Sequence, residues 1–249
     1  MLSRFKLLLL LAATVCAQGA VAGDFSVSPV RLEFAGISRS QLLSITNAGD
    51  KPSRFLARAT SWTMTENGGV ELKEDDTLLV FPASFTIAGK ATQNIRVGTD
   101  QRAGDTERTW RVVLEELPDA DTAGSQGATI NVLSIISVPV FMPPVVPRKA
   151  LAVSSQGFTG NAAKVGVVNS GNLHQMMAGV SVTAMRGEEV IQQAQQEGWY
   201  ILPGRNRAYT INGAANWCAP GVTRFELRVA DRDGQSLARQ TIDAREACR

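Results

Sequence analysis

The run from Thr129 to Phe141, TINVLSIISVPVF, constrains the fold of this chain more than any other feature. It is rich in β-branched residues and carries no charged side chain. Such a segment predicts a β-strand, and a strand of this kind would aggregate if it were exposed without a dedicated partner. We therefore expect an unpaired, apolar sheet edge that is built to receive a strand from another protein.

The first 22 residues are typical of an export signal. Arg4 and Lys6 precede an apolar stretch that starts at Leu7, and the segment ends in Ala20-Val21-Ala22, the small-x-small pattern before a cleavage site. The apolar run is shorter than the roughly 20 residues that a membrane-spanning helix needs. We expect cleavage after Ala22, a soluble periplasmic protein and no insertion into a membrane.

Charge and cysteine content narrow the partners further. Removing the signal takes away Arg4 and Lys6, its only charged residues, and brings the formal net charge from +2 to 0. A neutral chain gives no electrostatic reason to expect nucleic acid as a partner. Two cysteines, Cys218 and Cys248, remain in a compartment that oxidises thiols, and we expect them to form a structural disulfide.

From Phe25 onward the chain reads as an all-β protein. Short stretches of alternating apolar and polar residues are broken about every ten residues by Gly, Asn, Asp or Pro, and no sustained helical period occurs. The length fits two immunoglobulin-like sandwiches. A proline-rich connector, Pro143 to Lys149, predicts a first domain over 23–143 and a second over 144–249, held at a defined angle.

The two halves resemble each other. Leu42 to Phe55 and Ala163 to Met176 are both alternating strands that end in an Asn-x-Gly turn, at Asn47 and Asn169. Two copies of one topology explain this pattern, although unrelated β domains also share turn chemistry. The expected strands are 25–34, 41–47, 54–63, 78–81, 91–97, 109–117, 129–142, 150–154, 163–169, 179–185, 198–201, 207–211, 223–231 and 236–243.

The sequence gives little support for catalysis or for a bound cofactor. His174 is the only histidine and follows a turn, so we expect it to make a hydrogen bond on that turn. The acidic run Glu71 to Asp76 lacks the spacing of a calcium loop and predicts a solvated hairpin loop. We expect no enzyme activity, no metal and no cofactor.

Two arginines suggest binding instead. Arg31 lies in the first strand and Arg111 follows Trp110 in another apolar strand. An arginine inside an apolar strand either covers the sheet with its stem or offers its guanidinium to a carboxylate. Trp62 and Trp110 alternate with apolar neighbours and are expected in the core.

Seven segments, in this order, resemble the periplasmic pilus chaperones of the chaperone-usher pathway, and most closely the archaic branch that serves spore-coat-U-like pilins. They are SVSPVRLEF, ITNAGDKPSRFLARATSW, FTIAGKATQNIRV, TWRVVLEELP, INVLSIISVPVFMPP, NSGNLH and GWYILPG. The resemblance covers nearly all of the chain after the signal. It implies two immunoglobulin-like domains in an L or boomerang arrangement and, as partners, pilus subunits and an outer-membrane usher.

The resemblance also implies a mechanism, called donor-strand complementation. A pilin lacks the last strand of its own sandwich, and the chaperone completes it with an exposed strand, here Ile130 to Val138. The spacing of the family favours Ile130, Val132, Ser134, Ile136 and Val138 as the residues that face the pilin core. A slip of one residue would select Leu133 and Ile135 instead.

The family binds the C-terminal carboxylate of the pilin between its domains. Arg31 matches the arginine of the first strand, but Pro139 stands where one branch of the family has a lysine. Arg111 is therefore our candidate for the second cation. The free chaperone is also expected to be able to cover its donor strand with a second copy of itself.

A secreted two-domain adhesin or carbohydrate-binding protein on the same sandwich is the main alternative. It would require polar and aromatic residues gathered on loops at one end of the molecule. The chain has only two tyrosines, Tyr200 and Tyr209, which disfavours that alternative.

Overall fold

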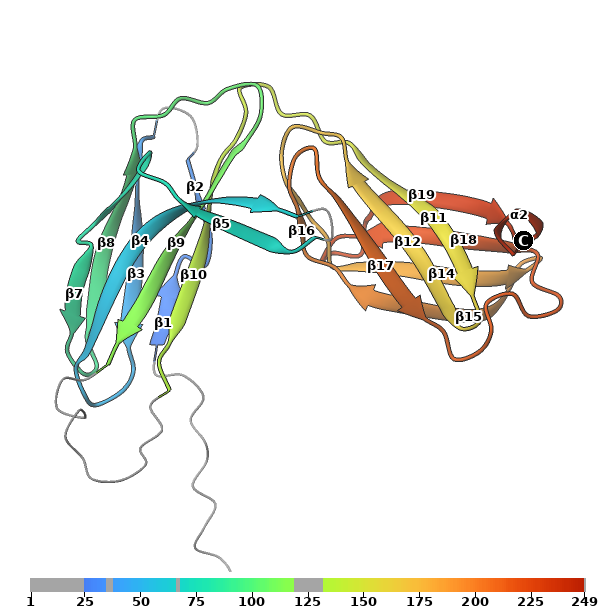
Figure 1. The fold of residues 1–249 in the computed structure, drawn as a ribbon, viewed down its shortest axis with the longest axis horizontal. Helices are drawn as coiled ribbons and strands as arrows, with labels where there is room; N and C mark the ends of the chain where they lie inside the picture. The colour runs from blue at the N-terminus through green and yellow to red at the C-terminus, as the bar shows by residue number, and fades with distance from the viewer. Residues whose placement is uncertain (1–24, 35–37, 66–67, 119–131, 249) are drawn as a thin grey trace, which may run out of the picture.

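The structure is a computed structural model that describes residues 25–34, 38–65, 68–118 and 132–248. The expected export signal and residues 129–131 of the donor run lie outside the described residues. Two immunoglobulin-like β-sandwiches follow one another along the chain and meet at an angle, as in a bent arm (Figure 1). The predicted all-β class is confirmed.

The first sandwich pairs a four-stranded sheet with a six-stranded sheet. The four-stranded sheet has the order β1 (Phe25–Ser28), β3 (Ser40–Asn47), β8 (Thr92–Thr99), β6 (Leu78–Phe81). The second has the order β2 (Leu32–Glu33), β10 (Ile135–Met142), β9 (Arg108–Leu117), β4 (Ser53–Met64), β5 (Val70–Glu74), and β7 (Ser84–Ile87) pairs with β4. Alternate residues of these strands are buried between the sheets, because side chains alternate across a strand. Trp110 lies in this core, as expected.

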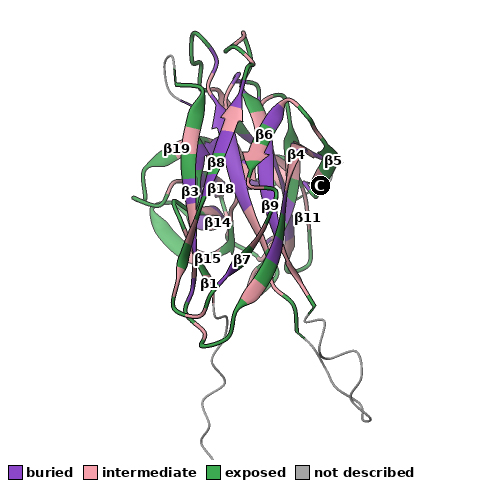
Figure 2. Ribbon diagram, turned by 90° about the vertical axis from the view of Figure 1, so that its left-hand side faces the viewer, coloured by how far each residue is buried: buried purple, intermediate pink, exposed green. Residues whose placement is uncertain are grey.

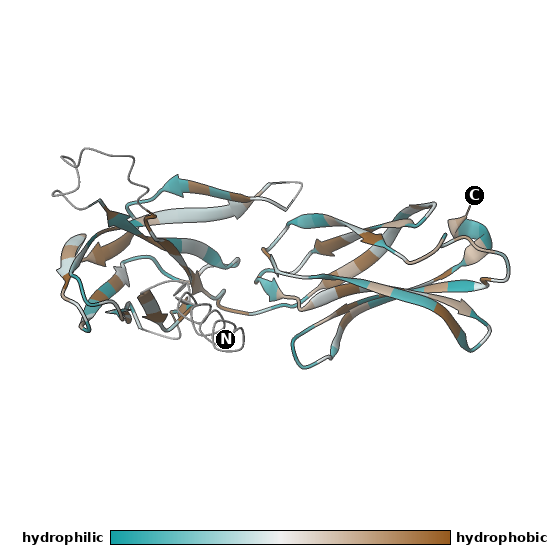
Figure 3. Cartoon of the chain, turned by 90° about the horizontal axis from the view of Figure 1, so that it is seen from below, coloured by the Kyte–Doolittle hydropathy of each residue, from teal (hydrophilic) through white to brown (hydrophobic). Residues whose placement is uncertain are grey.

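The second sandwich also has two main sheets. One contains β11 (Leu151–Thr159), β12 (Ala162–Asn169) and β17 (Asn206–Asn212). The other has the order β15 (Glu189–Glu197), β14 (Gly179–Arg186), β18 (Arg224–Ala230), β19 (Ser236–Asp243), and a short pair joins β13 (Gln175–Met176) and β16 (Tyr200–Ile201). Buried residues run along the inner strands of both sandwiches (Figure 2), and Figure 3 shows apolar residues alternating with polar ones along the same strands.

Equivalent asparagines support the repeat seen in the sequence. The Asn47 side chain accepts from the N–H of Gly49 and donates to the carbonyls of Lys51 and Ile87. The Asn169 side chain makes the same three kinds of bond, to Gly171, Leu173 and Ile201. Each asparagine is almost fully buried, so each turn is fixed to its sandwich by the same hydrogen-bond pattern.

Of the strands that the expected ranges leave out, β5 and β15 are the longest. The loop expected at Glu71 to Asp76 is wrong for residues 71–74, which belong to β5. This strand pairs with β4 and forms an exposed edge of the sheet. The edge strand β15 was also missed, since its run of Gln and Glu residues has little β propensity of its own. Both strands are specified by the neighbour they pair with.

The predicted first strand divides into two. β1 pairs with β3 in one sheet and β2 pairs with β10 in the other, so the chain changes sheets between Ser28 and Leu32. Arg31 lies in the bend where this change occurs. The bend thus brings Arg31 next to the strand that was expected to act as donor.

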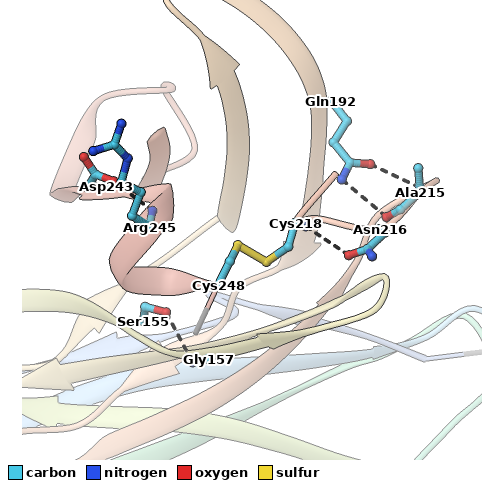
Figure 4. Close-up of a disulfide and its surroundings, with 9 residues drawn as sticks. All are labelled: Ser155, Gly157, Gln192, Ala215, Asn216, Cys218, Asp243, Arg245 and Cys248. Carbon is cyan, nitrogen blue, oxygen red and sulfur yellow. Dashed lines mark hydrogen bonds between the residues drawn. A yellow bond between two sulfur atoms is a disulfide. The ribbon is translucent and has the colours of Figure 1, made fainter. Parts of the chain in front are cut away.

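The expected disulfide is present. Cys218 and Cys248 join the loop after β17 to the end of the short helix α2 (Ala244–Ala247) (Figure 4). The Asp243 side chain caps this helix by accepting from the N–H of Arg245. The disulfide therefore closes the C-terminal end of the second sandwich, far along the chain from β10.

Candidate functional site

Strand β10 has one paired edge and one edge that is largely open. Along its whole length, from Ile135 opposite Glu115 to Met142 opposite Arg108, it pairs with β9. On the other edge, β2 pairs only with Val140 and Phe141. Within the part of the chain that the structure describes, the stretch from Ile135 to Pro139 has no strand on this second edge.

The hydrogen-bond pattern shows which backbone groups face the open edge. The carbonyl of Ser134 accepts from Glu116, so the backbone groups of even-numbered residues point to β9. The carbonyl of Phe141 accepts from Phe34, so those of odd-numbered residues point the other way. The open edge therefore presents the N–H and C=O groups of Ile135 and Ser137 and the C=O group of Pro139. Proline has no N–H, but at this position an N–H would point away from β9, so no hydrogen bond to β9 is lost.

The side chains in and before β10 form a buried group and an exposed group. Val138 is buried in the core of its own sandwich, and Ile136 packs partly against that core. Toward the N-terminal end, Val132, Leu133 and Ile135 are 88%, 42% and 66% exposed. Exposed apolar side chains are thus concentrated near the N-terminal end of β10, where no described strand covers its second edge.

This division corrects the predicted donor set in one respect. Ile130 lies outside the described residues, and Val132 and Ser134 precede the strand. Val138 is only 1% exposed, because it fills its own core, and it is not available to a partner's core. Of the rest of the set, Val132 is exposed and Ser134 is half-buried, whereas Ile136 packs partly against its own sandwich core. The exposed Leu133 and Ile135 belong to the alternative set.

Arg31 lies on the wall of a cleft between the two sandwiches. The cleft has a volume of about 420 Å3 and is lined by Pro29, Val30, Arg31, Met176, Tyr200 and Arg232. The Arg31 side chain is 44% exposed, and its nearest acidic neighbour is Glu33, at 3.9 Å. An exposed ion pair of this length is weak, so the Arg31 guanidinium is free to bind another carboxylate.

Arg111 lies in a different environment from the one expected. It is 8% exposed, its guanidinium carbon lies 4.2 Å from the ring centre of Trp62 and 5.4 Å from that of Trp199, and it donates to Ser137 at 3.1 Å. Burial lowers the pKa of Arg111, an effect that nearby Tyr200 opposes. Arg111 does not line the cleft, since its guanidinium is covered by tryptophan rings.

Trp62 is buried as expected, but not in the sandwich core. With Met64, Phe141 and Leu202 it forms a separate apolar cluster, against which Trp199 and Tyr200 pack. Residues of both domains contribute to this cluster. It therefore stabilises the angle between the sandwiches and, with it, the shape of the cleft.

His174 also acts between the domains. Its backbone N–H donates to Glu107 at 2.7 Å, and its ring Nδ1 lies 2.9 Å from the same carboxylate. Its ring stacks on Phe141, with 3.9 Å between ring centres. The expected bond within the turn is replaced by this contact to the first domain, which depends on the fold and had no local signal in the sequence.

The described part of the chain offers little else of chemical interest. It has no cluster of His, Cys, Asp or Glu side chains arranged to hold a metal ion. It also contains no helix long and apolar enough to cross a membrane.

Comparisons with known proteins agree with this architecture. Residues 24–146 match the family described as pili and flagellar-assembly chaperones, PapD N-terminal domain. Relatives named "Probable fimbrial chaperone EcpB", from Escherichia coli K12 and Shigella boydii, are 25% identical over 207 residues, which cover 73% of this chain and 87% of theirs. These matches show that the chain is similar to pilus-assembly chaperones, over its first domain by the family and over most of its length by the relatives.

Solved structures share the fold. A complex of CsuC and CsuE, described as a chaperone and tip adhesion subunit of archaic chaperone-usher Csu pili of Acinetobacter baumannii, matches with a TM-score of 0.58 at 12% identity over 89% of this chain and 98% of that one. The class 5 fimbriae chaperone CfaA matches with a TM-score of 0.56 at 12% identity, over 88% and 98%. At these identities the likeness concerns the fold.

Proposed function

We propose that this protein is a periplasmic chaperone of the archaic branch, which binds pilus subunits by donor-strand complementation and delivers them to an outer-membrane usher. The open edge of β10 is the observation that carries this proposal. Its unpaired backbone groups bond to the strands of a subunit, and the exposed apolar side chains beside it enter the subunit's incomplete core. The export signal expected over residues 1–22 supports a periplasmic location, and residues 23–143 form the proposed donor domain.

Subunit binding on this edge requires no rearrangement of the first sandwich. β10 is held by β9 on its other side, so its backbone is already extended when a subunit arrives. Preorganisation of this kind lowers the entropic cost of binding. An exposed apolar edge without a partner would promote aggregation, and in the proposed function the subunit is that partner.

Arg31 is proposed as the group that binds the C-terminal carboxylate of the subunit. It lies in the cleft, and among the described residues its ion pair is with Glu33 alone, at the long distance of 3.9 Å. A carboxylate that is removed from water needs a charged partner, and without one it costs several kcal/mol. The fold does not depend on Arg31, because its side chain is half exposed.

The test is co-purification of pilus subunits with the exported chain. A candidate pilus subunit is co-expressed with the exported chain, and Arg31→Ala is compared with the natural chain and with Lys51→Ala, a change of an exposed cation outside the cleft. We expect subunit recovery to fall strongly for Arg31→Ala alone. Normal recovery with Arg31→Ala would show that another group binds the carboxylate, and a natural chain that captures no subunit would contradict the function itself.

A further inference from the structure

The cleft that contains Arg31 carries a second arginine, and this one comes from the other domain. Arg232 lies in the turn between β18 and β19 and lines the same cleft, together with Tyr200 and Met176. Two cationic side chains from different domains thus border one space of about 420 Å3, which is within the range of small-ligand sites.

The turn that carries Arg232 is well ordered by its own hydrogen bonds. The Asp231 carboxylate accepts from the N–H groups of Asp233, at 3.1 Å, and Gln235, at 2.8 Å. The backbone N–H of Asp231 donates to the carbonyl of Gln235. Asp231 is therefore engaged with the turn backbone, and Asp233 is exposed beside it.

Neither arginine has a close ionic partner within the described part of the chain. Arg31 reaches Glu33 only at 3.9 Å, and the ion pairs and hydrogen bonds of the described residues include none from the Arg232 side chain. Like charges that border one cleft raise its potential and attract an anion. A carboxylate between them would accept charge-assisted hydrogen bonds from both guanidinium groups.

We infer that Arg232 is the second cation of the carboxylate site, which it completes together with Arg31. The inference rests on the proposed function. It gives Arg232 the role of second cation, for which the sequence had suggested Arg111. Arg111 is covered by Trp62 and Trp199, and Pro139 offers no charge, whereas Arg232 lines the cleft itself. A bound carboxylate therefore joins the two domains, and subunit binding fixes the angle between them.

The experiment compares two forms of one subunit, with a free and with an amidated C-terminus. The pilus subunit that co-purifies with the chain is prepared without its N-terminal extension, and its last strand is attached as a synthetic segment. Affinities are measured for the natural chain, Arg31→Gln, Arg232→Gln and Lys164→Gln. Lys164 is an exposed cation of β12 in the second domain that does not line the cleft, so it controls for the loss of one charge.

The ratio of the two affinities is the decisive quantity. For the natural chain and Lys164→Gln we expect the free carboxylate to bind about a hundredfold more tightly than the amide, and for Arg232→Gln about tenfold, since one charged hydrogen-bond partner is lost. An unchanged ratio in Arg232→Gln would overturn the inference and leave strand donation intact. Equal binding of acid and amide by the natural chain would also overturn it, and a chain that binds neither form would overturn the proposed function as well.

Discussion

Replacing Ile135 by proline tests the open edge of β10 directly. The N–H of Ile135 points away from β9, so its removal costs no hydrogen bond within the chaperone. The Ile135 side chain is 66% exposed, so little packing is lost. We therefore expect the free energy of unfolding to fall by less than about 1 kcal/mol.

Subunit affinity should respond much more strongly. The variant loses one hydrogen bond to the subunit and leaves a subunit carbonyl buried without a donor, a loss of about 2 kcal/mol or more. This corresponds to at least a thirtyfold loss of affinity, at about 1.4 kcal/mol for each factor of ten.

The assay is calorimetric titration with a pilus subunit that lacks its N-terminal extension, and thermal unfolding of the free chaperone is measured in parallel. Ile135→Val is the matched control, because it keeps both the N–H group and a β-branched side chain. A folded Ile135→Pro variant that binds the subunit as tightly as Ile135→Val would refute the assignment of this edge as the donor.

Three further predictions concern the parts of the molecule that support this edge. Arg111→Met should keep or raise the melting temperature, because burial of the charged guanidinium is costly. Subunit affinity should not change, because Arg111 does not line the cleft. A large loss of affinity in titration would restore Arg111 as an anchor. Glu107→Ala should lower stability by roughly 2 kcal/mol and broaden the interdomain angle in solution scattering, because His174 loses its partner; an unchanged scattering profile would contradict this role. Cys248→Ser should lower stability by about 3 to 4 kcal/mol, from the sequence separation of 30 residues to Cys218, without affecting subunit affinity in the same titration.

Much of the candidate site was predictable from local patterns. The apolar run around Ile135 predicted a strand with an uncovered edge, and Arg31 was found as a cation amid apolar neighbours. Local patterns did not place Arg111 correctly and made no prediction for Arg232. The Arg111 guanidinium is covered by Trp62 of its own domain and Trp199 of the other, and Arg232 lies in a turn that carries no signal for a binding role.

By itself, the sequence determined the β class, the cysteine pair and the apolar segment that carries the open strand edge, because alternation, turn residues and composition act over short stretches of chain. Only the tertiary structure decided which backbone groups stay unpaired and which arginines share a cleft. The register of β2 against β10 leaves Ile135 to Pro139 open, and the packing of Trp62 against the second domain determines where Arg111 lies. These outcomes depend on contacts between residues far apart in the chain, which no local pattern encodes.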